Sequence, residues 1–182
     1  MKFFTKDLWR RAQNAALGDH RILEWQQAES AYRAQLSSLR ARLRASELEF
    51  FAEADVHDGE LLELAINDGS RPAPQTEVVP AWRSSNDNPV KARLAVMDAR
   101  DEFVWQLSYQ NVRRALIDYP SSDPLFHSEG EGFGDWGFHE LSDAGDGFLC
   151  HEILFATGST LLFEFKDVAV SRVRRSQPFT SR

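Results

Sequence analysis

Three histidines of this sequence stand directly before an acidic residue, and a histidine beside a carboxylate is the pair from which metal and acid–base sites are built. Neither His-Glu dipeptide extends to the zinc-binding pattern His-Glu-x-x-His, because Asp143 and Phe155 occupy the last position. A site gathered from distant parts of the chain is therefore the form that a metal-dependent hydrolase would take. Its residues would be His57, Asp58, His139, Glu140 and His151. The competing interpretation is that these are surface or hydrogen-bonded strand residues.

Other catalytic and cofactor patterns fail on their context. The glycine-rich run at 129–134 follows no apolar strand, and its acidic neighbours would repel a phosphate. The acidic residues that follow lack the spacing of a calcium loop. Cys150 precedes His151 in a predicted strand, so the two side chains point to opposite faces and cannot act as a catalytic pair. We expect a lone buried cysteine, no metal site and no cofactor.

Acidic and aromatic residues gather in one segment, 119–147, which we interpret as a long loop. Between residues 118 and 146 the sequence has eight acidic residues and no lysine or arginine. Long loops in compact domains often carry function, and aromatic residues are enriched at protein interfaces. The segment favours a non-enzymatic protein, of an immunity or adaptor type, that binds a basic protein partner. The candidate contact residues are Phe133, Asp135, Trp136, Phe138, His139 and Glu140.

Composition limits the other classes of function. The chain has 182 residues, of which 42% are hydrophobic, enough for a core in one domain, 1–182. Its net charge of −7 disfavours nucleic acid as a partner. It has one cysteine, no signal-peptide pattern and no apolar run long enough to span a membrane. We therefore expect a cytoplasmic protein with no membrane partner.

Helical periodicity dominates residues 1–55. Thr5 is a suitable N-cap for a first helix over 6–16, which Gly18 ends, and Asp19 can cap a second helix that runs to about residue 54. An apolar seam follows the second helix in a heptad pattern: Ile22, Trp25, Tyr32, Leu36, Leu39, Leu43 and Phe50. Roughly 35 helical residues would span about 50 Å, longer than the domain is wide. The helix therefore either breaks near Ser37-Ser38 or projects, and a projecting helix would make the protein a structural subunit or a weak homodimer.

Period-two alternation and β-branched residues dominate the second part, 56–176, which we predict to be an antiparallel sheet of about six strands. The expected fold class is therefore α+β. Residues 70–90, rich in proline and serine, form the second long loop after a turn at Asp68-Gly69. Gly158-Ser159 favours a type II′ hairpin. The predicted strands are 91–97, 103–109, 112–118, 148–156, 160–166 and 168–173, and apolar residues also alternate over 62–66.

Both ends of the chain resemble a family of short, uncharacterised bacterial proteins classed as domains of unknown function. The similar runs are residues 1–9, then 136–141, 151–155 and 158–168, which together make up under a third of the chain. The family has no established activity, so the resemblance implies a bacterial, cytoplasmic origin and no catalytic residue.

Overall fold

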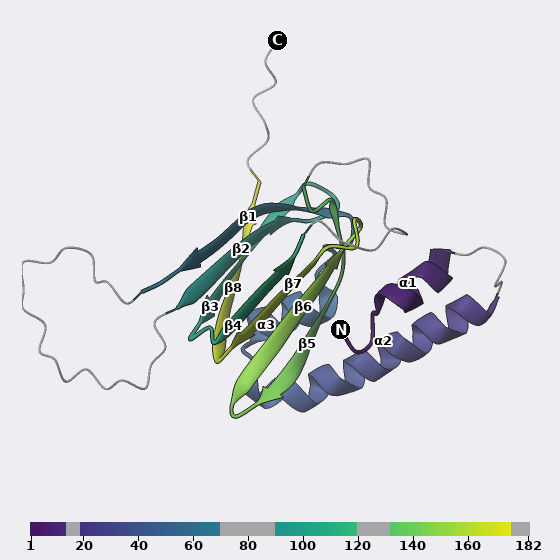
Figure 1. The fold of residues 1–182 in the computed structure, drawn as a ribbon, viewed down its shortest axis with the longest axis horizontal. Helices are drawn as coiled ribbons and strands as arrows, with labels where there is room; N and C mark the ends of the chain where they lie inside the picture. The colour runs from purple at the N-terminus through teal and green to yellow at the C-terminus, as the bar shows by residue number, and fades with distance from the viewer. Residues whose placement is uncertain (14–18, 70–89, 120–131, 176–182) are drawn as a thin grey trace, which may run out of the picture.

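The computed structural model describes residues 1–13, 19–69, 90–119 and 132–175, in which three α-helices precede an antiparallel sheet of eight strands (Figure 1). The α+β class is confirmed, and the expected strand number is too low. None of the described helices has the length and apolarity needed to cross a membrane. The helices are α1 Lys6–Gln13, α2 Asp19–Leu39 and α3 Ala45–Glu53, with a short 3-10 turn, Arg40–Arg42, between α2 and α3. The strands are β1 Gly59–Asn67, β2 Lys91–Met97, β3 Phe103–Gln110, β4 Arg114–Asp118, β5 Asp135–Gly145, β6 Phe148–Phe155, β7 Thr160–Phe165 and β8 Asp167–Arg174.

The sheet consists of two four-stranded halves that meet at one corner. The strand order is β4-β7-β6-β5-β1-β2-β3-β8, and β1 pairs with β5 only through Gly59 with Trp136 and Glu60 with Asp135. Gly59 makes this corner possible, because a Cβ there would lie 2.1 Å from the carbonyl oxygen of Met97. Beyond the corner the halves diverge, and most of β5 has no strand beside one of its edges.

The inner faces of the two halves pack on each other and on α3. Tyr109 of β3 stacks on Phe163 of β7 with ring centroids 5.0 Å apart, which joins the halves across the core. Phe50 of α3 packs edge-on against Trp105 of β3 at 5.4 Å. Burial of several large aromatic side chains in one cluster is the main source of stability for this arrangement.

The predicted long helix breaks, so the expectation of one helix from residue 19 to about 54 is wrong. Ser37 and Ser38 still belong to α2, and their hydroxyls donate to the carbonyls of Arg33 at 2.9 Å and Gln35 at 2.6 Å. The break follows directly after them, where α2 ends at Leu39. Helix α3 begins after Arg44, whose backbone N–H donates to the Glu47 carboxylate at 2.5 Å. Four residues of the apolar seam are then buried in the protein's own core, namely Tyr32, Leu36, Leu39 and Phe50, whereas Ile22 is 49% exposed. The helix does not project as one unbroken element, and the homodimer stays a prediction.

Helix α2 also covers the free edge of β5. The Tyr32 hydroxyl accepts the backbone N–H of Leu141 at 3.2 Å, and the Gln35 amide donates to the Leu141 carbonyl at 3.0 Å. The same Tyr32 hydroxyl donates to the Phe51 carbonyl at 3.3 Å. Side chains of one helix thus satisfy backbone groups that a neighbouring strand would otherwise bond. In Figure 1, α2 lies alongside β5.

The predicted loop 119–147 is wrong in its second half, because residues 135–145 form β5 in the middle of the sheet. Two irregularities of register hide this strand from the sequence pattern, one between Trp136 and Phe138 and one between Asp143 and Gly145. Each inserts a residue and resets the alternation of inward and outward side chains. Most of the predicted loop 70–90 lies outside the described residues. The strands that flank it pair antiparallel, with Asn67 opposite Lys91.

The predicted C-terminal hairpin is confirmed in its pairing and corrected in its turn. β6 and β7 pair antiparallel, with Leu154 opposite Thr160. The turn is not a two-residue type II′ turn, because the Phe155 N–H donates to the Ser159 carbonyl and leaves three residues in the loop. Gly158 closes it at φ +75, a left-handed position that suits glycine. The Thr5 cap is also confirmed, since its hydroxyl accepts the Leu8 N–H at 3.1 Å.

Candidate functional site

Three polar side chains form a hydrogen-bonded chain through the apolar core. The Tyr109 hydroxyl lies 2.7 Å from Nδ1 of His151, and Nε2 of His151 lies 3.0 Å from Nδ1 of His139. Strands β3, β6 and β5 supply them: β5 and β6 are neighbours in one half of the sheet, and β3 lies in the other half. Tyr109 and His151 are fully buried, whereas His139 is only partly so. The chain therefore leads from the centre of the core towards its boundary.

Burial keeps the three hydrogen-bonded side chains Tyr109, His151 and His139 uncharged. It lowers the pKa of His139 to about 3 and the pKa of His151 well below its usual range. It raises the pKa of the Tyr109 phenol well above its usual value near 10. The surroundings explain these directions, because Phe50, Phe51 and Trp136 surround the two imidazoles and give no ionic partner. At neutral pH all three groups act as neutral hydrogen-bonding groups.

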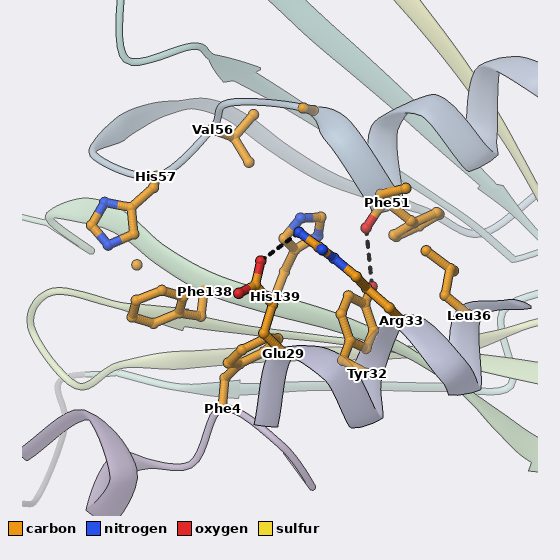
Figure 2. Close-up of a pocket in the computed structure, with 13 residues that line it drawn as sticks. Phe4, Glu29, Tyr32, Arg33, Leu36, Phe51, Val56, His57, Phe138 and His139 are labelled. Atoms are coloured by element: carbon orange, nitrogen blue, oxygen red, sulfur yellow. Dashed lines mark hydrogen bonds and ion pairs between the residues drawn. The ribbon is translucent and has the colours of Figure 1, made fainter. Parts of the chain in front are cut away.

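His139 lines a cavity of about 180 Å³ along the free edge of β5. Helix α2 forms one wall, and α3 with the segment that leads to β1 forms the other. In Figure 2 the His139 ring lies between Phe138 and His57 on one side and Phe51 and Leu36 on the other. An apolar cavity of about 150 Å³ in another protein holds benzene, so this one has room for a group of similar size. The remaining lining residues are Phe4, Glu29, Tyr32, Arg33, Ala52, Ala54, Val56 and Gly137.

Charged residues lie only at the mouth of this cavity. Arg33 forms an ion pair with Glu29 one helical turn earlier, at 2.6 Å, and both side chains are well exposed. His57 stands beside Phe138, with ring centroids 4.8 Å apart, and its Nδ1 lies 3.0 Å from the Asp58 carboxylate. The mouth thus holds the Arg33–Glu29 ion pair and the contact of His57 with Asp58, and the walls deeper in are aromatic and aliphatic.

Glu140 lies on the other face of β5 and does not reach the cavity. Its buried carboxylate accepts the backbone N–H of Lys2, that of Phe3 at 2.9 Å and that of Phe4 at 3.3 Å. These bonds hold the first residues of the chain against the outer face of the sheet. Phe138 lies on that face too and packs against the rings of Phe4, Trp9 and Trp25, with centroids 4.5–5.8 Å away. At the edge of β5 it also lines the cavity mouth beside His57. This carboxylate has a structural role.

The residues of the predicted hydrolase site do not converge. His139 and His151 touch, His57 and Asp58 lie at the cavity mouth, and Glu140 faces away from both. No group of three or more potential metal ligands lies together within the described ranges. Cys150 is buried on the face opposite His151, as its position in the strand predicts, and burial raises its thiol pKa to about 12.

The candidate partner-binding residues do not form an exposed surface. Trp136 is buried in the core, and Glu140 is buried on the opposite face of β5. Phe138 and Phe133 are partly covered by other rings. Only Asp135 among the six is exposed. Phe133, Trp136 and Phe138 thus pack against the sheet and the helices and do not form an exposed patch.

Two described acids of the same segment, and Asp118 just before it, lie close to basic side chains of the protein. Asp143 bonds Arg42 at 3.0 Å, Asp146 lies 3.6 Å from Arg113, and Asp118 lies 3.6 Å from Lys6. Their negative charge is thus partly offset within the protein. Binding of a basic protein partner here stays a prediction, and residues 120–131 lie outside the described part.

Sequence reasoning missed Tyr109, Tyr32 and Phe51 as residues of the site. Tyr109 reads as one more aromatic in an alternating strand, and Tyr32 as one more seam position of a helix. The available signal was the pair His139 and His151, which the hairpin of two adjacent strands brings close together. Their shared orientation depends on the bulge at Gly137, which alternation alone does not reveal.

Comparison with protein-family models finds no match to this chain, and comparison with curated proteins finds none either. Among solved structures, the crystal structure of an uncharacterized protein from Neisseria gonorrhoeae is similar over 63% of this chain and 91% of its own length. The sequence identity is 13% and the TM-score is 0.41. A similarity this distant transfers no residue role, so a function has to follow from the cavity and its side chains.

Proposed function

We propose that this protein is a non-catalytic binding protein that takes a small, largely apolar group into the cavity beside His139. The observation that carries the proposal is an uncharged imidazole on the wall of an aromatic-lined cavity. Ligand sites are typically concave and apolar, with a few placed polar groups that fix orientation. This keeps the class of function that the sequence predicts and moves its site from the acidic segment to the cavity.

The protonation state of the site favours binding over acid–base catalysis. A general acid or base works best when its pKa lies near the working pH. The pKa of His139 is about 3, so this imidazole stays neutral at physiological pH and gives or takes a proton poorly. A neutral imidazole in an apolar wall is suited to one directed hydrogen bond.

The cavity size limits the ligand. A volume of about 180 Å³ suits a ring of six or seven heavy atoms rather than a nucleotide or a peptide. For seven heavy atoms that each contribute about 0.6 kcal/mol, the expected dissociation constant is on the order of 1 mM. A free metabolite or a single side chain of a partner protein would present such a group.

Methyl NMR with cyclohexanone as the probe tests this proposal. Leu36 and Val56 both line the cavity, so their methyl signals should shift and saturate with the probe. Ala54→Leu fills the cavity and should weaken the binding at least tenfold, since the probe and the new side chain compete for the same space. Ala41→Leu adds the same atoms at an exposed position outside the cavity and should leave the binding unchanged.

Unsaturable or uniformly scattered shifts would contradict a defined site. If folded Ala54→Leu protein bound the probe as tightly as the wild type, the probe would bind outside the cavity, which would contradict the proposal.

A further inference from the structure

In the hydrogen-bonded chain Tyr109–His151–His139 the distances alone do not show which group donates and which accepts at each contact. A neutral imidazole carries one proton, on either nitrogen, so the two contacts can be read from Tyr109 outward or from His139 inward. Which reading holds decides whether His139 presents a donor or an acceptor to the cavity. The hydroxyl at the buried end settles the choice.

Tyr109 has to donate its hydroxyl proton to His151. Within the described residues, Nδ1 of His151 is the single hydrogen-bond partner of this hydroxyl, and the Tyr109 side chain is fully buried. If Nδ1 carried a proton, the hydroxyl would accept it and its own proton would be left in the core without an acceptor. A buried donor without a partner is strongly unfavourable. Nδ1 of His151 is therefore the acceptor.

The direction then passes along the chain. His151 is neutral, so its proton lies on Nε2 and is donated to Nδ1 of His139 across 3.0 Å. His139 is neutral as well, so its proton lies on Nε2. In the described part of the protein Nε2 of His139 has no hydrogen-bond partner. This nitrogen is not fully buried, so a ligand atom can reach it. Because the His139 ring lines the cavity, Nε2–H is the donor that this ring can present there.

Building on the proposed function, we infer that Tyr109 and His151 lock His139 as an Nε2–H donor, so that the cavity binds small neutral molecules with a carbonyl oxygen. The oxygen accepts the Nε2–H, and the hydrocarbon part occupies the aromatic walls. A carboxylate fits less well, because the Arg33 guanidinium at the mouth is already paired with Glu29 at 2.6 Å and the deeper walls are apolar, so little offsets the loss of its hydration. A protonated Nε2 also has no lone pair for a metal, which disfavours the hydrolase interpretation at this residue.

Tautomer-sensitive nitrogen NMR tests the lock without any ligand. Two-bond couplings between ring nitrogens and ring protons distinguish a protonated from an unprotonated nitrogen. We expect both His139 and His151 to carry their proton on Nε2 at pH 7. A proton on Nδ1 of His139 would overturn the inference, whatever the cavity binds.

A matched pair of probes tests the donor in the cavity. Cyclohexanone and methylenecyclohexane have the same shape, and only the first has an acceptor oxygen. Wild-type protein should bind cyclohexanone roughly three- to tenfold more tightly, the value of one net hydrogen bond. In His139→Phe, which keeps a ring and removes the donor, the two affinities should agree within about twofold.

The outcomes separate the two proposals. Equal affinity for both probes in the wild type would overturn the donor inference and leave the binding site in place. Failure of both probes to shift the Leu36 and Val56 methyl signals would overturn the proposed function itself. If His139→Phe does not fold, the tautomer measurement and the wild-type probe pair still decide.

Discussion

Tyr109→Phe is the substitution that most directly probes the buried chain. It removes one hydroxyl and keeps the ring, which stacks on Phe163 at 5.0 Å and packs against Phe165 at 4.8 Å. The loss leaves Nδ1 of His151, 2.7 Å away in the wild type, as an acceptor without a partner in a fully buried position. We therefore expect a loss of stability that comes from the polar groups and not from packing.

The expected loss is about 1–3 kcal/mol in the free energy of unfolding, the cost of one buried polar group left unsatisfied. For a chain of this length each kcal/mol corresponds to a melting temperature lower by about 2–4 °C, so the shift should be about 2–12 °C. Urea unfolding followed by tryptophan fluorescence measures the loss in the free energy of unfolding, because Trp105 and Trp136 are both buried in the same core.

Tyr119→Phe is the matched control. Tyr119 is 49% exposed, so its hydroxyl is not expected to need a protein partner, and the same change should alter stability by less than about 0.5 kcal/mol. The reasoning would be refuted if Tyr109→Phe also stayed within about 0.5 kcal/mol of the wild type, since the hydroxyl would then not satisfy His151.

Three further predictions concern the same architecture. Stability should be constant above about pH 7.5 and fall towards pH 4.5, because the folded pKa values of His139 and His151 lie below that of an unfolded histidine, and the unfolded chain then binds up to two more protons. The slope, from urea midpoints across that range, should be up to about 2.7 kcal/mol per pH unit. Gly59→Ala should prevent folding or lower stability by more than about 3 kcal/mol, since its Cβ would meet the Met97 carbonyl at 2.1 Å. Glu140→Gln should lower the hydrogen-exchange protection of the Phe3 and Phe4 amides by about tenfold or more, because one carboxylate oxygen becomes an amide donor.

Each of these has a comparison within the chain. His139→Phe should reduce the pH slope by about 1.4 kcal/mol per pH unit, and an unchanged slope would show that His139 is not the titrating group. Gly147→Asn, at a left-handed position with open space around it, should cost less than about 1 kcal/mol. Glu60→Gln, on an exposed strand position, should leave the Phe3 and Phe4 amides as protected as in the wild type.

The sequence by itself predicted features that depend on local chemistry. The Thr5 cap follows from one hydroxyl within reach of the next helical turn, and the hairpin of β6 and β7 follows from alternation on both sides of a glycine turn. The opposite faces of Cys150 and His151 follow from strand geometry alone. The α+β class rests on the change from helical to alternating periodicity, which neighbours in sequence determine.

Only the tertiary structure decided how far the second helix runs, where β5 lies and which polar groups meet. After α2 ends, Phe50 packs against Trp105 and Phe51 against His151, and these contacts depend on residues far along the chain. β5 is a strand because β6 pairs with it across two irregularities that break the alternating pattern. The contact of Tyr109 with His151 joins residues 42 positions apart on separate strands. No local pattern encodes such a meeting, because it follows from the way the two halves of the sheet close on each other.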